Sequence, residues 1–298
     1  MKITIIDSIS QYEKLFSLEN GREDYYRDTM MRPFQEMWQT INVPIKARQP
    51  NGYDVVMATQ MLGYLDLTNT EVGKQALKKL KEIHALQTAQ ETLTNCVNFS
   101  ERNKLTIHAP ELLFGMYLAD PAKLELQHGY SGFGGIPGYI QISIDPNSYN
   151  IPRIPAVIAH EFHHNIRFSY VDWDHGNVTV GDYLVIEGLA ESFAKELYGV
   201  ECLGPWVTSF DEEDLQYSTE VIEKALDVKG FAEVSSYMFG DTIAISQGYQ
   251  PVGLLEFAGY AVGHKVVQSF MEKNNVGIAE ATLLSSDEII SECGIFHQ

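Results

Sequence analysis

The chain has 298 residues, 45% of them hydrophobic, which is enough to bury a sizeable core as one large domain or as two lobes. Acidic residues number 40 against 21 basic ones, and the formal net charge of −19 argues against nucleic acid, whose phosphates it would repel. No apolar run approaches the roughly 18 residues that a membrane-spanning helix needs, so we expect no membrane partner. The 3 cysteines are widely spread, which argues against a disulfide framework and indicates a reducing cytoplasm.

The first hundred residues are predicted to be mainly helical. Residues 1–7 form a short apolar run that reads as a strand. Apolar side chains then recur at helical spacing between residues 26 and 41, between 70 and 83 with Thr70 suited to cap the helix, and around 93–97. These stripes indicate core packing rather than cofactor contacts.

After residue 104 the pattern changes to the twofold period of strands. Lys104–His108 and Leu124–Gln127 alternate in this way, and Gly-rich turns follow at 129–135. The clearest strand is Tyr139–Asp145, whose isoleucines face one way and whose polar residues face the other. Pro137 just before it suits an edge strand. Such a strand either pairs with an extended peptide or simply completes the sheet.

The stretch Ile154–Phe168 is predicted to be a buried helix, because it is apolar on several sides and nothing in it breaks a helix. It contains the H-E-x-x-H pattern, with His160 and His164 one turn apart, so that both imidazoles can bind one metal ion. Glu161 is rotated by about 100° from His160 and can take a proton from a zinc-polarised water without being a ligand. The alternative is a pair of core histidines that form hydrogen bonds inside the protein.

A second predicted helix, Tyr183–Tyr198, carries two more acidic candidates. Asp182 is suited to cap this helix and Gly199 to end it. Glu187 and Glu191 lie four positions apart and project the same way, where like charges repel unless a cation lies near them. Glu187 is therefore the predicted third metal ligand, and Glu191 is predicted to accept a hydrogen bond from a ligand histidine.

A polar loop lies between these two helices. It contains Asp172, Asp174 and His175. This loop is either a second metal site or a surface turn.

Residues 200–298 are predicted to be largely helical, and they contain two candidates for stabilising negative charge on a substrate. Attack on a carbonyl places charge on its oxygen, and a phenol or imidazole opposite the metal is expected to donate to it. Tyr260, between two glycines on a predicted helix, is the catalytic residue that we predict for this role. His264, one turn further on, is the competing donor, and the remaining interpretation is that Tyr260 is a core aromatic.

The two motifs together resemble those of the gluzincin metallopeptidases. These motifs are His160-Glu161-Phe162-His163-His164 and Glu187-Gly188-Leu189-Ala190-Glu191. In gluzincins the third zinc ligand is a glutamate on the helix that follows the H-E-x-x-H helix. The segments 134–138 and 259–263 are similar to those of a bacterial family of predicted cytoplasmic zinc proteases, and this similarity extends over roughly residues 70–275.

The resemblance implies an α+β, zincin-like fold with a twisted sheet over the H-E-x-x-H helix. It implies one catalytic unit with an N-terminal lobe over residues 1–169 and a mainly helical C-terminal lobe over 170–298. It also implies that His160, His164 and Glu187 bind Zn²⁺ and that Glu161 is the general base. The motif by which aminopeptidase relatives recognise a free N-terminus is absent from residues 135–145, so exopeptidase specificity is not implied.

The predicted function is that of a cytoplasmic zinc metallopeptidase, a hydrolase that cleaves a peptide or protein substrate. The alternative is a zinc-stabilised regulatory or binding protein with little or no proteolytic activity. A regulator needs only the metal ligands, whereas hydrolysis also needs a base. The presence of Glu161 therefore favours the enzyme.

Overall fold

The computed structural model describes residues 1–49, 52–173 and 176–297 and divides into two compact units. Unit 1 comprises Met1–Asn98 and Ile107–Asn165, and unit 2 comprises Phe99–Thr106 and Ile166–Gln298. The fold is α+β, as predicted, with every strand of the described residues in unit 1. The predicted lobe boundary at residue 169 stays a prediction.

Unit 1 contains a four-stranded sheet. Most of its helices lie between β1 and β2 in the sequence, and α7 follows β4. Its elements are β1 (Lys2–Ile5), α1 (Ser8–Ser17), α2 (Arg22–Tyr25), the π-helical turn η1 (Tyr26–Met31), η2 (Arg32–Phe34), α3 (Gln35–Thr40), α4 (Val55–Met61), α5 (Thr70–Glu82), α6 (Ala85–Arg102), β2 (Glu111–Leu118), η3 (Glu125–Gln127), β3 (Tyr130–Phe133), β4 (Tyr139–Ile144), η4 (Ile151–Arg153) and α7 (Ile154–Arg167). The last four residues of α6 and the last two of α7 belong to unit 2.

Unit 2 is helical. Its further elements are α8 (Val180–Tyr198), η5 (Val200–Cys202), α9 (Pro205–Thr208), α10 (Glu212–Glu223), α11 (Phe231–Phe239), α12 (Asp241–Ser246), α13 (Ala258–Asn274), α14 (Ile278–Ala281) and α15 (Ser286–Glu292). The predicted helical character of residues 200–298 is confirmed.

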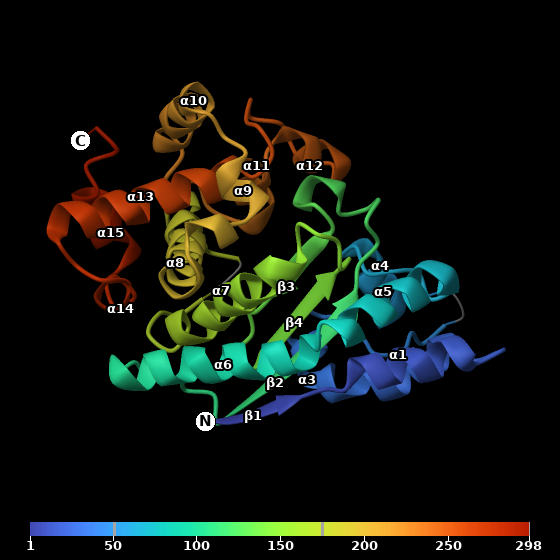
Figure 1. Cartoon of the computed structure of the whole chain (residues 1–298). Coiled ribbons are helices and arrows are strands. Elements are labelled where there is room, and N and C mark those ends of the chain that lie inside the picture. The colour runs from blue at the N-terminus through green and yellow to red at the C-terminus, as the bar shows by residue number, and fades with distance from the viewer. Residues whose placement is uncertain (50–51, 174–175, 298) are drawn as a thin grey trace. The chain divides into compact units, whose positions relative to one another are not determined.

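The sheet has the strand order β1-β2-β4-β3 (Figure 1). Strands β1, β2 and β4 run parallel, and β3 runs antiparallel to β4. Both faces are covered, because the isoleucines of β4 are buried on one face while Gln141 and Ser143 are buried on the other. On that second face the Tyr64 hydroxyl donates a hydrogen bond of 3.0 Å to Gln141, and the Tyr64 ring stacks on Tyr117.

The prediction that residues 139–145 form an edge strand is wrong. β4 lies between β2 and β3, and the edges of the sheet are β1 and β3. The alternation that suggested a wet face has another cause, since Gln141 and Ser143 are buried and the Gln141 side chain accepts a hydrogen bond from buried Tyr64. The hypothesis that an extended peptide pairs with residues 139–145 loses its basis, because both sides of β4 are already paired.

The predictions of strands at Lys104–His108 and at Leu124–Gln127 are wrong. α6 continues to Arg102 and ends where Lys104 adopts a φ of 58°, and the Leu105 N–H then donates to the Ser100 carbonyl at 2.9 Å. The segment 124–127 contains η3 and is followed by His128 with a φ of 56°. These predictions missed β2, and they assigned the residues of β3 to Gly-rich turns.

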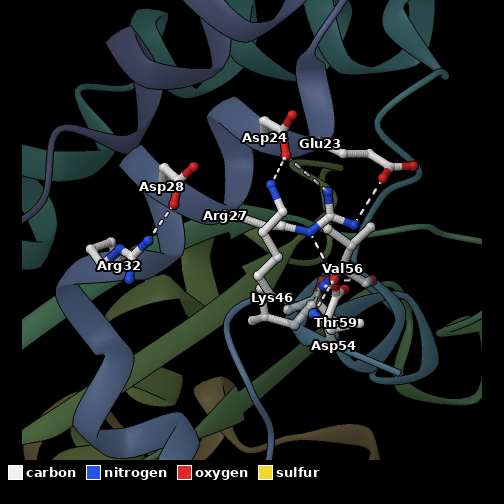
Figure 2. A network of polar contacts seen from close by, with 11 residues as sticks. Glu23, Asp24, Arg27, Asp28, Arg32, Lys46, Asp54, Val56 and Thr59 are labelled. Carbon is white, nitrogen blue, oxygen red and sulfur yellow. Dashed lines mark hydrogen bonds and ion pairs between the residues drawn. The ribbon is translucent and has the colours of Figure 1, made fainter. Parts of the chain in front are cut away.

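A polar network orders the segment between α2 and α4 (Figure 2). The Arg27 guanidinium donates to Asp54 at 2.8 Å and to Glu23 at 2.8 Å. Asp54 also caps α4 by accepting the Val56 N–H at 3.0 Å. Asp54 is buried, so its ion pair with the half-buried Arg27 compensates for the loss of hydration.

Candidate functional site

Helix α7 carries three of the predicted site residues. It begins directly after the turn η4, with Pro155 in its first turn, and every residue from Ala156 to Arg167 is buried. His160 and His164 are 5% and 6% exposed, and their ring centroids lie 5.0 Å apart. The helix therefore presents two imidazoles to one buried point, as their spacing predicted.

Glu161 lies against the edge strand. Its side chain is 6% exposed and occupies the space next to Gly132 of β3, where an added Cβ would lie 2.6 Å from the Glu161 Cδ atom. Because Gly132 pairs with Ile142 of β4, the carboxylate lies on the isoleucine face of the sheet. The sequence did not indicate this contact.

Helix α8 carries the two acidic candidates, but its cap differs from the predicted one. Thr179 is the N-cap and accepts the Asp182 N–H at 2.9 Å, while Asp182 accepts the Thr179 N–H at 3.2 Å, which makes a capping box. The helix thus starts at Val180, earlier than predicted. Glu187 and Glu191 are 6% and 2% exposed.

His160, His164 and Glu187 form the one group of histidine, cysteine or acidic side chains within the described residues that could hold a metal ion. Each offers one ligand atom, and these atoms lie within 4.8 Å of one another. Two imidazole nitrogens and one carboxylate oxygen are a donor set that Zn²⁺ accepts, with a fourth position left for water. The chemistry of the residues present therefore fits zinc.

Glu191 has a partner that the sequence did not predict. The indole N–H of Trp206, at the start of α9, donates a hydrogen bond to the Glu191 carboxylate. Its predicted role beside a ligand histidine stays a prediction.

Tyr260 lies in the first turn of α13 and is surrounded by aromatic rings. Its ring centroid is 5.9 Å from that of Phe239, 5.9 Å from that of Phe257 and 6.4 Å from that of Trp206. One turn further on, the Nε2 atom of His264 is buried without a hydrogen-bond partner. Burial lowers the pKa of His264 to about 4, against the opposing charge of nearby Glu191, so the ring is neutral at neutral pH.

The structure describes only part of the loop that was predicted to be either a second metal site or a surface turn. Asp172 is exposed. Asp174 and His175 lie outside the described residues.

Sequence reasoning missed Asn165, which lies one turn after Glu161 on α7. Its side chain accepts the Gly138 N–H at 2.6 Å and donates to the Gly134 carbonyl at 3.2 Å and the Tyr139 carbonyl at 3.5 Å. A buried asparagine directly after the second histidine was the available signal, because buried amides are usually hydrogen-bonded to backbone.

A family model and relatives from Bacillus subtilis match this chain. A family model described as predicted Zn-dependent protease (DUF2268) matches residues 85–291. The chain is 62% identical over 297 residues to the uncharacterized protein YjfC of Bacillus subtilis, covering 99% of both chains. It is 26% identical over 137 residues to the uncharacterized protein YjaZ of the same organism, covering 46% of this chain and 49% of YjaZ. No solved structure matches.

The chain therefore belongs to the family of predicted Zn-dependent proteases. The matched residues include α7, α8 and α13. Within the described part of the chain, no helix is both long and apolar enough to cross a membrane.

Proposed function

We propose that this protein is a zinc metallopeptidase of the gluzincin type, which hydrolyses peptide bonds in a peptide or protein substrate. The observation that carries the proposal is the buried group of His160, His164 and Glu187, with Glu161 next to His160 on the same helix. The two histidines and Glu187 would hold zinc, and Glu161 would accept a proton from water.

Each residue has a separate task in the proposed reaction. When bound, zinc supplies a Lewis acid that polarises a water molecule and the substrate carbonyl. The Glu161 carboxylate takes the proton from the attacking water and passes it to the leaving amide nitrogen. The Tyr260 hydroxyl donates a hydrogen bond to the oxygen that becomes negatively charged.

Net charge and cysteine usage support the proposed substrate class and compartment. A net charge of −19 supports a peptide or protein substrate rather than nucleic acid. All three cysteines lie in the described part of the chain, and none of them forms a disulfide there. This supports a cytoplasmic enzyme.

Glu187→Ala tests the third ligand, with the exposed Glu196→Ala on the same helix as its control. Removing one of three protein ligands should weaken zinc binding by roughly 100-fold or more, since even residues that only orient ligands contribute 10–100-fold. Zinc content after dialysis should be close to stoichiometric for the wild type and for Glu196→Ala, and strongly reduced for Glu187→Ala. Equal zinc content in all three proteins would remove Glu187 from the site.

A further inference from the structure

Two glycines of the edge strand and its following loop lie against the proposed base. A Cβ atom added to Gly132 would overlap the Oε1 atom of Glu161 and would lie 2.6 Å from its Cδ and Cγ atoms. A Cβ atom added to Gly134 would instead overlap the Glu161 carbonyl oxygen and lie 2.8 Å from its carbonyl carbon. No real side chain tolerates contacts this close, so the atoms of Glu161 fill the space that side chains would need here.

The consequence of adding a side chain differs between the two positions. At Gly132 the obstacle is the far end of a flexible side chain, which can rotate away. At Gly134 the obstacle is the backbone of a buried helix, which cannot. At Gly135 the nearest atom is a ring carbon of Phe133 at 3.7 Å, an ordinary van der Waals distance.

The loop after β3 is tied to the helix that carries the base. Asn165 is fully buried and bonds to the backbone of Gly134, Gly138 and Tyr139. It lies one helical turn after Glu161, so these bonds hold the loop and the start of β4, the strand with which Gly132 pairs, close to the Glu161 turn of α7. Gly132 therefore cannot drift away from Glu161 without breaking buried hydrogen bonds.

We infer that Gly132 is a positioning residue for Glu161: its missing side chain leaves the space in which the carboxylate of the base is held. This inference rests on the proposed function, because it assigns Gly132 a role through the base. A carboxylate that must reach a water molecule acts only from a narrow range of positions, and displacement by about 1 Å can cost about 100-fold in rate. The requirement at residue 132 is thus for glycine, although β3 itself would accept other residues.

The test compares Gly132→Ala with Gly135→Ala, both as zinc-loaded proteins. Gly132→Ala should lower kcat roughly 100-fold on a cleavable peptide, with KM changed less than about twofold, because substrate binding does not use this space. Zinc content and melting temperature should stay at their wild-type values, and a crystal structure should show the Glu161 carboxylate moved away from β3. Gly135→Ala should leave all of these quantities unchanged, whereas Gly134→Ala should lower the melting temperature.

Wild-type kcat in Gly132→Ala, or a Glu161 carboxylate that keeps its position in that variant, would overturn the inference. If Gly132→Ala does not fold, the double variant Gly132→Ala/Glu161→Ala should fold, since the obstructing side chain is gone; a double variant that stays unfolded counts against it. A wild-type protein that cleaves nothing would instead defeat the proposed function. In that case the carboxylate position in the crystal structure still decides whether Gly132 holds Glu161.

Discussion

Tyr260, the proposed hydrogen-bond donor to the substrate oxygen, lies among aromatic rings. The rings of Phe239, Phe257 and Trp206 surround it, so its side chain is also part of the packing of unit 2. The flanking Gly259 supports this, since a Cβ there would lie 2.6 Å from the Cα atom of Met238. Packing fixes the ring, and a fixed ring holds a hydroxyl in one direction.

Tyr260→Phe separates the two roles, because it keeps the ring and deletes only the donor. Losing one hydrogen bond that is made to the developing negative charge should lower kcat at least tenfold, and about 100-fold is typical of such donors. Zinc content and KM should change little. Steady-state kinetics with Tyr217→Phe, an exposed tyrosine, as control would measure the effect.

A Tyr260→Phe variant with wild-type turnover would contradict this role. If His264→Ala were then inactive, the donor would be the imidazole. Burial keeps that imidazole neutral at neutral pH, and a neutral imidazole still has one N–H to donate.

The grouping of the proposed ligands was predictable because two of them lie one turn apart on one helix and the third lies on the next helix. His160, Glu161 and His164 lie on one helix, and Glu187 follows on the next. The importance of Gly132 was not predictable from the sequence. It depends on the Glu161 side chain, which fills the space beside Gly132 and belongs to a distant part of the sequence. From the sequence alone, a glycine in a Gly-rich stretch is expected to form a turn, because its neighbours in space are not known.

At the scale of elements, α8 and α13 form the most extensive helix pair of unit 2, and glycines mark their crossing. A Cβ on Gly188 would lie 2.5 Å from the Gly263 carbonyl carbon, and one on Gly263 would lie 3.1 Å from the Leu184 carbonyl carbon. The backbones of the two helices therefore touch. Gly188 directly follows Glu187, so this crossing also fixes the turn that carries the third proposed ligand.

Gly188→Ala should destabilise the protein, although alanine favours a helix more than glycine does. Overpacking against a backbone atom costs about 1–3 kcal/mol, which exceeds the roughly 1 kcal/mol gained in helix propensity. Urea unfolding of the metal-free protein would measure the change. Glu196→Ala should alter the stability by less than about 0.5 kcal/mol. An unchanged or raised midpoint for Gly188→Ala would show that the helices can separate at no cost.

Elements with a long, regular spacing of apolar residues were predictable, and elements without such a spacing were not. α7 and α8 have long apolar patterns and clear ends, although the cap of α8 is Thr179 rather than Asp182. β2 is buried along nearly its whole length and therefore has no alternation to detect. β4 does alternate, but its polar residue Gln141 is buried and bonds to Tyr64, so the alternation predicted the strand but not its place in the sheet.

At the scale of the whole molecule, the family match and the site point to the same chemistry. The family model covers residues 85–291, which include every proposed ligand, the base and Tyr260. The first 84 residues lie outside it, yet they supply β1 and the tyrosine layer beneath the sheet. Burial, followed by the charges of Tyr12 and Glu161, holds the pKa of Tyr64 above its ordinary value.

The most direct test of the central claim is cleavage of a broad peptide library, read by mass spectrometry, with zinc-loaded wild type and Glu161→Gln side by side. Glutamine keeps the shape of the side chain but cannot take a proton, and residue 161 is not a proposed ligand. We predict cleavage by the wild type, a loss of several orders of magnitude in Glu161→Gln, and equal zinc content in both. No cleavage by the zinc-loaded wild type, or equal cleavage by both proteins, would contradict a zinc peptidase that uses Glu161 as its base; the first result would favour a zinc-stabilised binding protein.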